Sequence, residues 1–566
     1  MPTQASQSSE LHVAGAEVLI AGSPAPPEMR ALIVEVRVQD TVSLPSSAIV
    51  RFSDPEMTLI DDSKLAIGKE IEVKFSELAG RSMTSVFKGE IVALEPNFSE
   101  TGLEMLVRAY DKSHRLQRGR AVKTYQQVTA TDIVKQLCSE AGIPGDVEST
   151  TPQYEFFMRK GETPREVIAR FEREYNYRFW LADGKYNFKK AAVSGAAIPL
   201  KLRENLIAFR PRASAAEVST EVAVRGWDPK KKAAIVGTGT PTQTAATTGG
   251  FTPNTARSAF SEAKVFTGSR VVDTAGEAND LAKALAGRKA DSVVEAEGTT
   301  FGDPKIRAAT KVKIENVGTR FAGEYVVSSV SHTYSSKTGY KTHFRISGAA
   351  TRGLLDLMRP PERRDWSQNL VVGVVTNNND PESTGRVRVK FPSLSDQEES
   401  AWARIASVSA GDARGLMMLP QVNEEVIVGF ENGDPRRPIV VGSLFNGKDK
   451  PGTDLIQNKD GSFALLSNEQ GLMHTKKDMT FKSDKKMVIE VTEDQSVKAK
   501  SIASETQQGA KLKSGTTYEI EAGSSMTIKG VSVTVEASAS LTLKGATVDV
   551  QASGPLTLKG AIINIG

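Results

Sequence analysis

The last part of the chain repeats itself every fifteen residues. The hexapeptides SMTIKG, SLTLKG and PLTLKG begin at Ser525, Ser540 and Pro555. In each repeat a glycine is followed by large apolar residues at the third, fifth, eleventh and thirteenth positions. Alternation of this kind is typical of β-strands. Each repeat is therefore predicted to form two short strands, with its glycine at a corner between strands.

The corner and interior positions of the repeat follow directly from this alternation. The predicted corner glycines are Gly515, Gly530, Gly545 and Gly560. The predicted interior side chains are Tyr518, Ile520, Met526, Ile528, Val533, Val535, Leu541, Leu543, Val548, Val550, Leu556, Leu558, Ile563 and Ile565. The positions between them are mostly Thr, Ser, Lys, Glu and Asp, which suit a solvated outer surface.

A short repeat that cannot bury its own apolar face must stack on further copies of itself. Four apolar side chains in each repeat do not offset the backbone entropy of ordering fifteen residues. The one cysteine of the chain, Cys138, excludes disulfide staples. Three intertwined chains would give every strand two neighbours and a dry core, so we predict a homotrimeric, triple-stranded β-helix over residues 462–566. A flattened solenoid closed by one chain, with two strands per turn, is the alternative.

Length and composition limit what the rest of the chain can be. A chain of 566 residues is expected to hold several domains. Its net charge of +4 does not favour nucleic acid as a partner. Five scattered histidines and one cysteine predict no metal site, and no cofactor motif or catalytic constellation is recognisable. No basic residue precedes Arg30 and no long apolar run occurs, so we expect the chain to be made and folded in the cytoplasm.

Five strand-like segments precede the repeats, between residues 369 and 447. They are NLVVGVVTN, TGRVRVKF, SAWARIASV, NEEVIVGF and RPIVVGSL. Turn sequences such as NNNDPESTG and ENGDPRRP separate them. Five strands in about 80 residues predict a small closed barrel of the OB type.

Several short motifs in this barrel carry a resemblance to a known family. The motif residues are Asp380, Pro381, Gly385, Arg386, Pro392, Trp402, Arg404, Pro420, Gly433, Asp434, Pro435 and Gly442. In this order they resemble the baseplate OB domain of contractile tail spikes, the family of phage hub-spike proteins and VgrG proteins. One position departs from the family pattern, because Asn423 stands where glycine is usual; asparagine tolerates the same left-handed backbone. The resemblance covers phage tails, type VI secretion and extracellular injection particles alike.

The first two thirds of the chain alternate between strand-rich and helical segments. Two helices are expected, one starting near Thr131 and one capped by Thr163, and a third is expected over TAGEANDLAKALAGRK. The stretch GTGTPTQTAATTGGFTPNT at 237–255 predicts an exposed loop. The arrangement resembles the hub of the same family, two β-barrels with an α/β insertion.

These expectations together give a mainly β chain of eight segments. They are an N-terminal segment 1–29, hub β-barrel 1 at 30–112, an α/β insertion at 113–191, hub β-barrel 2 at 192–357, a linker 358–368, the OB collar 369–447, a linker 448–461 and the needle 462–566.

The resemblance implies a mechanical function. A trimeric spike would join the inner tube of a contractile injection system to a membrane-piercing needle, as part of a bacterial phage-tail-like or secreted particle. It implies as partners the inner tube protein, baseplate proteins, a PAAR-type tip protein, effector cargo and the target cell envelope, with no nucleic acid and no catalysis. The alternative from another class is a cell-wall-degrading enzyme or a glycan-binding adhesin on a β-helix stalk.

Overall fold

A computed structural model describes residues 15–76, 82–100, 102–190, 195–216, 218–242, 245–268, 270–347, 366–412, 414–415, 417–450, 456–457, 463–466 and 471–565. Two compact units are present, one holding residues up to Ile456 with 464–472, the other holding 457–463 and Met473–Gly566. Among the described residues, no helix is long and apolar enough to cross a membrane. Most of the predicted linkers, 358–368 and 448–461, and residues 1–14 lie outside the described residues.

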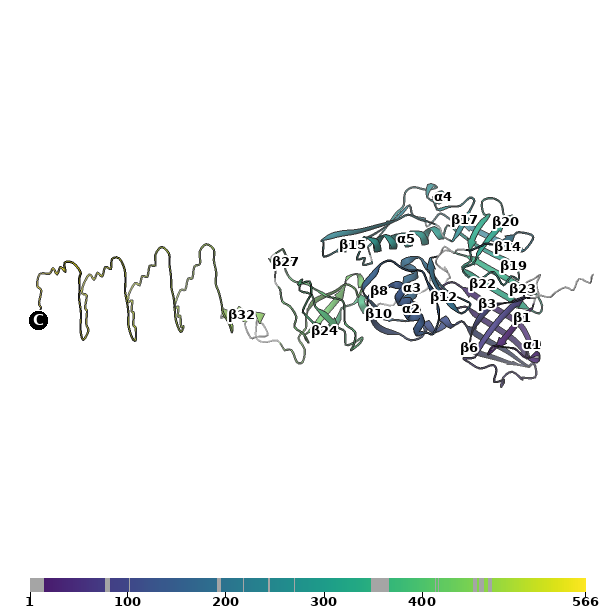
Figure 1. Cartoon of the computed structure of the whole chain (residues 1–566), viewed down its shortest axis with the longest axis horizontal. Helices are drawn as coiled ribbons and strands as arrows, with labels where there is room; N and C mark the ends of the chain where they lie inside the picture. The colour runs from purple at the N-terminus through teal and green to yellow at the C-terminus, as the bar shows by residue number, and fades with distance from the viewer. Residues whose placement is uncertain are drawn as a thin grey trace, which may run out of the picture. The chain divides into compact units, whose positions relative to one another are not determined.

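One sheet of eleven strands takes its strands from residues 16–346 of the first unit (Figure 1). Its strands are β1 (Ala16–Ile20), β2 (Ser23–Pro24), β3 (Ile33–Thr41), β4 (Ser47–Asp54), β5 (Glu70–Ser76), β6 (Met83–Ser99), β7 (Gly102–Tyr110), β14 (Leu206–Ala213), β19 (Val294–Phe301), β22 (Ser329–Ser335) and β23 (Gly339–Ile346). Their order is β14-β19-β23-β22-β3-β4-β7-β6-β5-β1-β2. A short helix, α1 (Pro27–Ala31), connects β2 to β3.

The two predicted hub barrels are therefore parts of one continuous sheet. β3 pairs with β22 in antiparallel register, with Asp40 opposite Val330, so the segments 30–112 and 192–357 share hydrogen bonds. The physical reason is that each half would otherwise leave an unpaired strand edge. The predicted N-terminal segment 1–29 is not separate either, because β1 pairs with β5 along its whole length. Alternation in AEVLI is too short to predict that pairing from sequence.

Each half of the sheet covers its own apolar core. The first core includes Val36, Val50, Phe52 and Phe75, all at most 1% exposed. The second core gathers around Tyr325 and Phe344 and also takes in a four-stranded sheet. That sheet has the order β13 (Ile198–Lys201), β20 (Lys311–Glu315), β21 (Gly323–Val326) and β17 (Ala246–Thr248).

The α/β insertion lies between the two halves in sequence. Its elements are the 3₁₀-helix η1 (Lys112–Gln117), β8 (Ala121–Thr129), α2 (Ala130–Glu140), β9 (Gly145–Val147), β10 (Gln153–Glu162), α3 (Pro164–Tyr175), β11 (Tyr177–Ala182) and β12 (Lys185–Lys190). Thr163 and Glu166 form the capping box that starts α3, as the sequence predicts. The side chain of Cys138 is fully buried on α2, as part of the apolar core of the insertion.

A second helix layer follows, and it corrects the loop predicted at 237–255. This region contains β15 (Glu221–Asp228), β16 (Ala233–Gly239), β18 (Lys264–Thr267), α4 (Pro253–Ser258) and α5 (Ala275–Asp291). Gly237 and Gly239 lie on β16 directly against α5, where an added Cβ would come within 2.2 Å and 2.4 Å of the helix backbone. The glycines therefore serve close strand–helix packing and not a loop, and β17 makes Ala246 part of the second core.

The predicted OB barrel is present. Its five-stranded sheet has the order β25 (Arg388–Lys390), β24 (Val371–Asn377), β29 (Glu425–Phe430), β30 (Pro438–Ser443) and β26 (Arg404–Ile405). Backbone hydrogen bonds between Val387 and Ala403 close it into a barrel. Smaller elements are η2 (Trp366–Gln368), the hairpin β27 (Ala410–Gly411) and β28 (Arg414–Gly415), and η3 (Glu431–Gly433). The next strands, β31 (Ile456–Gln457), β32 (Phe463–Leu466) and β33 (Gly471–His474), form a separate small sheet.

Candidate functional site

Asp380 organises the first loop of the OB domain. Its carboxylate accepts hydrogen bonds from the backbone amides of Glu382, Thr384 and Arg386. Arg386 Nη2 lies 2.7 Å from Asp380 Oδ1 and ties the two ends of the loop together. Gly385 has φ 76°, the left-handed region that glycine adopts without strain. The hydrogen bond from Arg386 lowers the pKa of Asp380 far below its usual value, although burial opposes it.

Asp380→Asn is expected to lower the free energy of unfolding of the OB domain by about 2 kcal/mol, because the loop loses charge-assisted hydrogen bonds. Hydrogen exchange of the β24 and β25 amides measures this loss. Asp396→Asn is the matched control, since Asp396 is exposed in the same domain and should change the free energy by less than about 0.5 kcal/mol. Equal protection in the two variants would contradict the role given to Asp380.

Trp402 lies against two arginines, Arg388 of β25 and Arg386 two residues before it. The guanidinium carbons of Arg386 and Arg388 are 5.8 Å and 5.0 Å from the centre of its ring, within cation–π range. Arg388 also pairs with Glu399 at 3.5 Å, and Arg404 is exposed at the start of β26. Carboxylates of the same domain thus pair with the charges of Arg386 and Arg388.

The other predicted motif residues occupy loops, turns and strand β30. Pro381 is exposed in the Asp380 loop, Pro392 follows the buried Phe391, and Gly442 lies in β30. The Pro420 carbonyl accepts a hydrogen bond from Asn378. Asn423 has φ 75°, which confirms that asparagine takes the left-handed conformation expected at the family's glycine position.

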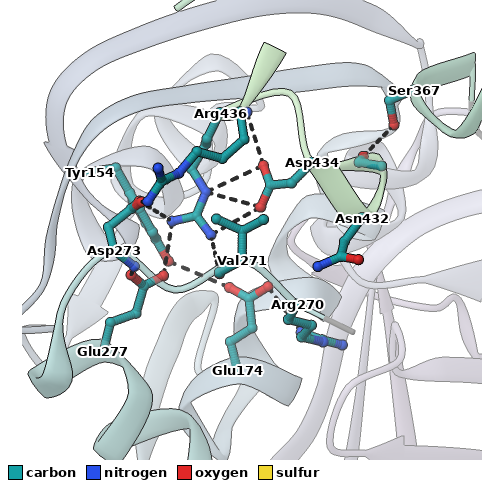
Figure 2. A network of polar contacts seen from close by, with 12 residues as sticks. Tyr154, Glu174, Arg270, Val271, Asp273, Glu277, Ser367, Asn432, Asp434 and Arg436 are labelled. Carbon is teal, nitrogen blue, oxygen red and sulfur yellow. Dashed lines mark hydrogen bonds and ion pairs between the residues drawn. The ribbon is translucent and has the colours of Figure 1, made fainter. Parts of the chain in front are cut away.

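The turn Gly433-Asp434-Pro435 brings the OB domain against the helices of the preceding region (Figure 2). Asp434 accepts hydrogen bonds from Arg436, with Nε at 3.1 Å and Nη2 at 3.0 Å. Arg436 Nη1 lies 2.9 Å from Glu277 Oε1 of α5. Gly433 has φ 72°, and its carbonyl accepts a hydrogen bond from the Ser367 hydroxyl.

Arg436 makes further contacts with the segment that precedes α5. Its Nη1 lies 3.2 Å from Asp273 Oδ2, and its Nη2 donates to the Val271 carbonyl at 2.7 Å. The neighbouring Arg437 donates to the same Asp273 carboxylate at 2.6 Å. The Arg436 guanidinium also lies over the ring of Tyr154, 5.5 Å from its centre (Figure 2).

The pKa values in this network follow from burial and from the charge of Arg436. Burial raises the pKa of Glu277 above its usual value, although the charge of Arg436 opposes the shift. Burial is the largest influence on Asp434 and opposes its ionisation, but the charge of Arg436 and the hydrogen bonds from it together lower the pKa of Asp434. Burial disfavours the charged form of Arg436, yet the charges of Asp434, Glu277 and Asp273 raise its pKa.

Arg436, Asp273 and Glu277 are not predicted from the sequence as site residues. Asp273 and Glu277 are separated from Arg436 by 163 and 159 positions, so no local pattern joins them. The one available signal is that Arg436 directly follows the Asp434-Pro435 turn, where its side chain extends the same surface.

The fifteen-residue repeats form an extended path of short straight segments, drawn as a regular wave in Figure 1. The chain bends at 476–477, 484–485, 492–493, 500, 507–508, 515–516, 523–524, 531–532, 538–539, 546, 553–554 and 561. Successive bends thus begin seven or eight residues apart. The four predicted corner glycines, Gly515, Gly530, Gly545 and Gly560, lie in or immediately before a bend.

Within one chain the predicted interior side chains of the repeats are all exposed. Their exposed fractions run from 50% at Ile563 to 86% at Ile565. Side chains one repeat apart have nearly the same exposed fraction, which is 57%, 55% and 54% at Tyr518, Val533 and Val548. Every described residue from 472 to 565 is exposed, and the described residues 475–565 form no strand pairs with one another.

Comparison with protein families gives two matches. The family described as the type VI secretion system/phage-baseplate injector OB domain matches residues 371–445, which contain the Asp380 loop and the Asp434 turn. The family described as the Alg8 N-terminal domain matches residues 10–336, more than half of the chain.

Similar curated proteins are spike proteins of type VI secretion and a related toxin. The spike protein VgrG3 of Vibrio cholerae is 37% identical over 91 residues, 15% of this chain and 9% of that protein. The spike protein VgrG5 of Pseudomonas aeruginosa is 33% identical over 131 residues, 22% of this chain and 17% of that protein. The actin cross-linking toxin VgrG1 of Vibrio cholerae is 25% identical over 189 residues, 30% of this chain and 17% of that protein. The chain thus matches less than a fifth of the length of each of these relatives.

Solved structures of similar fold include two tail-related proteins. A type VI secretion component of E. coli covers 75% of this chain and 99% of its own length, with 16% identity and a TM-score of 0.49. The 43 kDa tail protein of prophage MuSo2 from Shewanella oneidensis covers 59% and 98%, with 15% identity and a TM-score of 0.47.

Residues 371–445 therefore match an OB domain of the type VI secretion and phage-baseplate injector kind, and the chain is similar to VgrG spike proteins of type VI secretion. By the match over residues 10–336, it belongs to the family of the Alg8 N-terminal domain.

Proposed function

We propose that three copies of the chain share their repeats as one triple-stranded β-helix needle. The observation that carries this proposal is the exposure of every predicted interior side chain along a regularly bent, extended path. Apolar surface of this amount is stable in water only when another surface covers it. Two further copies of the same path offer side chains with the same fifteen-residue spacing.

The alternative of a solenoid closed by one chain receives less support. Such a solenoid would pair the strands of successive repeats within the chain. The described residues 475–565 contain no such pairs, and the bends recur without bringing neighbouring repeats into hydrogen-bonding contact. Pairing between chains leaves this extended path intact.

The function is mechanical under this proposal. The hub of the spike joins the inner tube of a contractile injection system, the OB domain forms a collar, and the needle pierces the target envelope without catalysis. Continuous strand pairing around a dry core would transmit axial force without local unfolding. The segment boundaries of the hub, collar and needle given above are kept within this proposal, with the first barrel extended to β1.

The partners follow from the same proposal. They are two further copies of the chain, the inner tube protein, other baseplate proteins and the target cell envelope. A PAAR-type tip protein would bind the needle, and effector cargo would travel with the spike. Assembly would take place in the bacterial cytoplasm.

The solution mass of the intact protein tests the trimer. Sedimentation or light scattering is expected to give three times the chain mass of 60.9 kDa. The reason is that one or two chains leave part of each repeat's apolar surface in water. A folded monomer whose residues 476–565 resist protease would overturn the proposal.

A further inference from the structure

The OB domain has an apolar core of its own. Buried side chains such as Val375, Val389, Phe391 and Val428 form it, and all its members lie between residues 371 and 440. Among the described residues, no apolar cluster of the hub or insertion includes a residue of the OB domain. Apolar burial therefore does not fix the orientation of this domain on the rest of its unit, and polar contacts must do so.

Most of these polar contacts lie at exposed positions. Lys230 pairs with Glu382 at 2.7 Å, but their side chains are 61% and 41% exposed. Asn432 donates to the Gly268 carbonyl at 3.3 Å in an exposed contact, whereas the half-buried Thr124 amide donates to Glu398 at 2.9 Å. Exposed pairs of this kind are screened by solvent and contribute little to the free energy of docking.

Arg436 differs from these contacts in burial and in the number of its partners. Its side chain is 14% exposed, and that of Glu277 is 15% exposed. Its Nε and both terminal nitrogens donate hydrogen bonds (Figure 2). Asp434 holds the guanidinium on the OB side, while Glu277, Asp273 and the Val271 carbonyl receive it on the α5 side.

Removal of this guanidinium would leave the docked arrangement without its central charge. Glu277 and Asp434 would face each other as carboxylates in a site that is largely shielded from water. Burying the two carboxyl groups without the guanidinium is unfavourable whether they stay charged or take up a proton, so separation of the two surfaces, which lets water in, would become the more stable state.

We infer that Arg436 is a latch that holds the OB domain in one orientation on α5 and the segment before it, and that without it the two parts move independently while each stays folded. The inference rests on contacts within one chain and not on the proposed trimer. It assigns to a single side chain the rigid connection between collar and hub that a force-bearing spike needs.

Distance measurement between two spin labels in the full-length protein tests the latch. Labels are placed on Lys185→Cys in β12 and Arg404→Cys in β26, both exposed positions. The native thiol does not compete, because Cys138 is fully buried and burial raises its pKa to about 12. Labelled chain is diluted with unlabelled chain so that only distances within one chain are detected.

The unsubstituted protein is expected to give one narrow distance, and Arg436→Ala is expected to lose it in favour of a broad distribution. Asp273→Asn with Glu277→Gln approaches the latch from the hub side and leaves the OB domain unaltered, so it should broaden the distance as well. Arg210→Ala, an exposed arginine of β14 outside the joint, serves as the control and should leave the distance narrow.

A narrow distance in Arg436→Ala would overturn the inference. So would a broad distance in Arg436→Ala beside a narrow one in the hub-side variant, because Arg436 would then act only within its own domain. Since all distances are intramolecular, these outcomes do not depend on whether the mass measurement finds three chains.

Discussion

The full-length protein with Val548→Asp and Leu556→Asp is expected to lose the proposed needle while residues 1–447 stay folded. Both side chains occupy predicted interior positions of the repeat, and both are exposed in the single chain, at 54% and 55%. In a needle shared by three chains they would bring six carboxylates, two from each chain, into the dry core. Each buried carboxylate without a cation costs several kcal/mol, which exceeds what the neighbouring apolar contacts return.

Limited proteolysis followed by mass spectrometry measures this effect. The variant should be cut throughout residues 476–565, whereas the unsubstituted protein should keep that region whole. The matched control is Thr542→Asp with Thr557→Asp, which places the same charge on the same repeats at positions predicted to face solvent. A protease-resistant needle in the interior variant would refute the assignment of interior positions, and loss of the needle in the control would refute the assignment of outer ones.

Features that depend on neighbouring residues in the chain could be predicted from the sequence. The start of α3 is predictable from Thr163, Pro164 and Glu166, because a capping box spans only four consecutive residues. The OB barrel follows from five alternating segments and the turns between them. The left-handed Asn423 follows from the same local logic, since one residue type decides the conformation.

Features that depend on distant partners could not be predicted. The pairing of β3 with β22 joins positions nearly 300 residues apart, and the sequence of neither strand specifies its pairing partner. Gly237 and Gly239 resemble loop residues until α5 is seen against them. Arg436 is an ordinary turn arginine in the sequence, and its role depends on Asp273 and Glu277 lying opposite it. A buried polar site of this kind is formed by the tertiary fold alone.

The eleven-stranded sheet is expected to lose about 3 kcal/mol of its free energy of unfolding as the pH falls from about 6.5 to about 4, because His332 resists protonation in the folded chain. This residue of β22 is fully buried. Its Nε2–H donates to the Ile306 carbonyl at 2.9 Å, and its Nδ1 accepts from the Tyr340 hydroxyl at 2.8 Å, so the ring is held neutral. Burial lowers its pKa to about 4, with help from the charge of Arg307, while Asp40 opposes the shift.

The sign of the pH effect follows from the two protonation states. Below pH 6.5 the unfolded chain binds a proton at His332, whereas the folded chain binds it only near pH 4. Between these pH values the unfolded state is therefore stabilised relative to the folded state. Hydrogen exchange of the β22 amides at pH 7 and pH 4.5, corrected for intrinsic rates, measures the difference. His332→Gln keeps a neutral donor and acceptor but cannot titrate. It should be less stable at pH 7 yet lose less between the two pH values, whereas an equal loss in both proteins would assign the pH dependence to the carboxylates and not to His332.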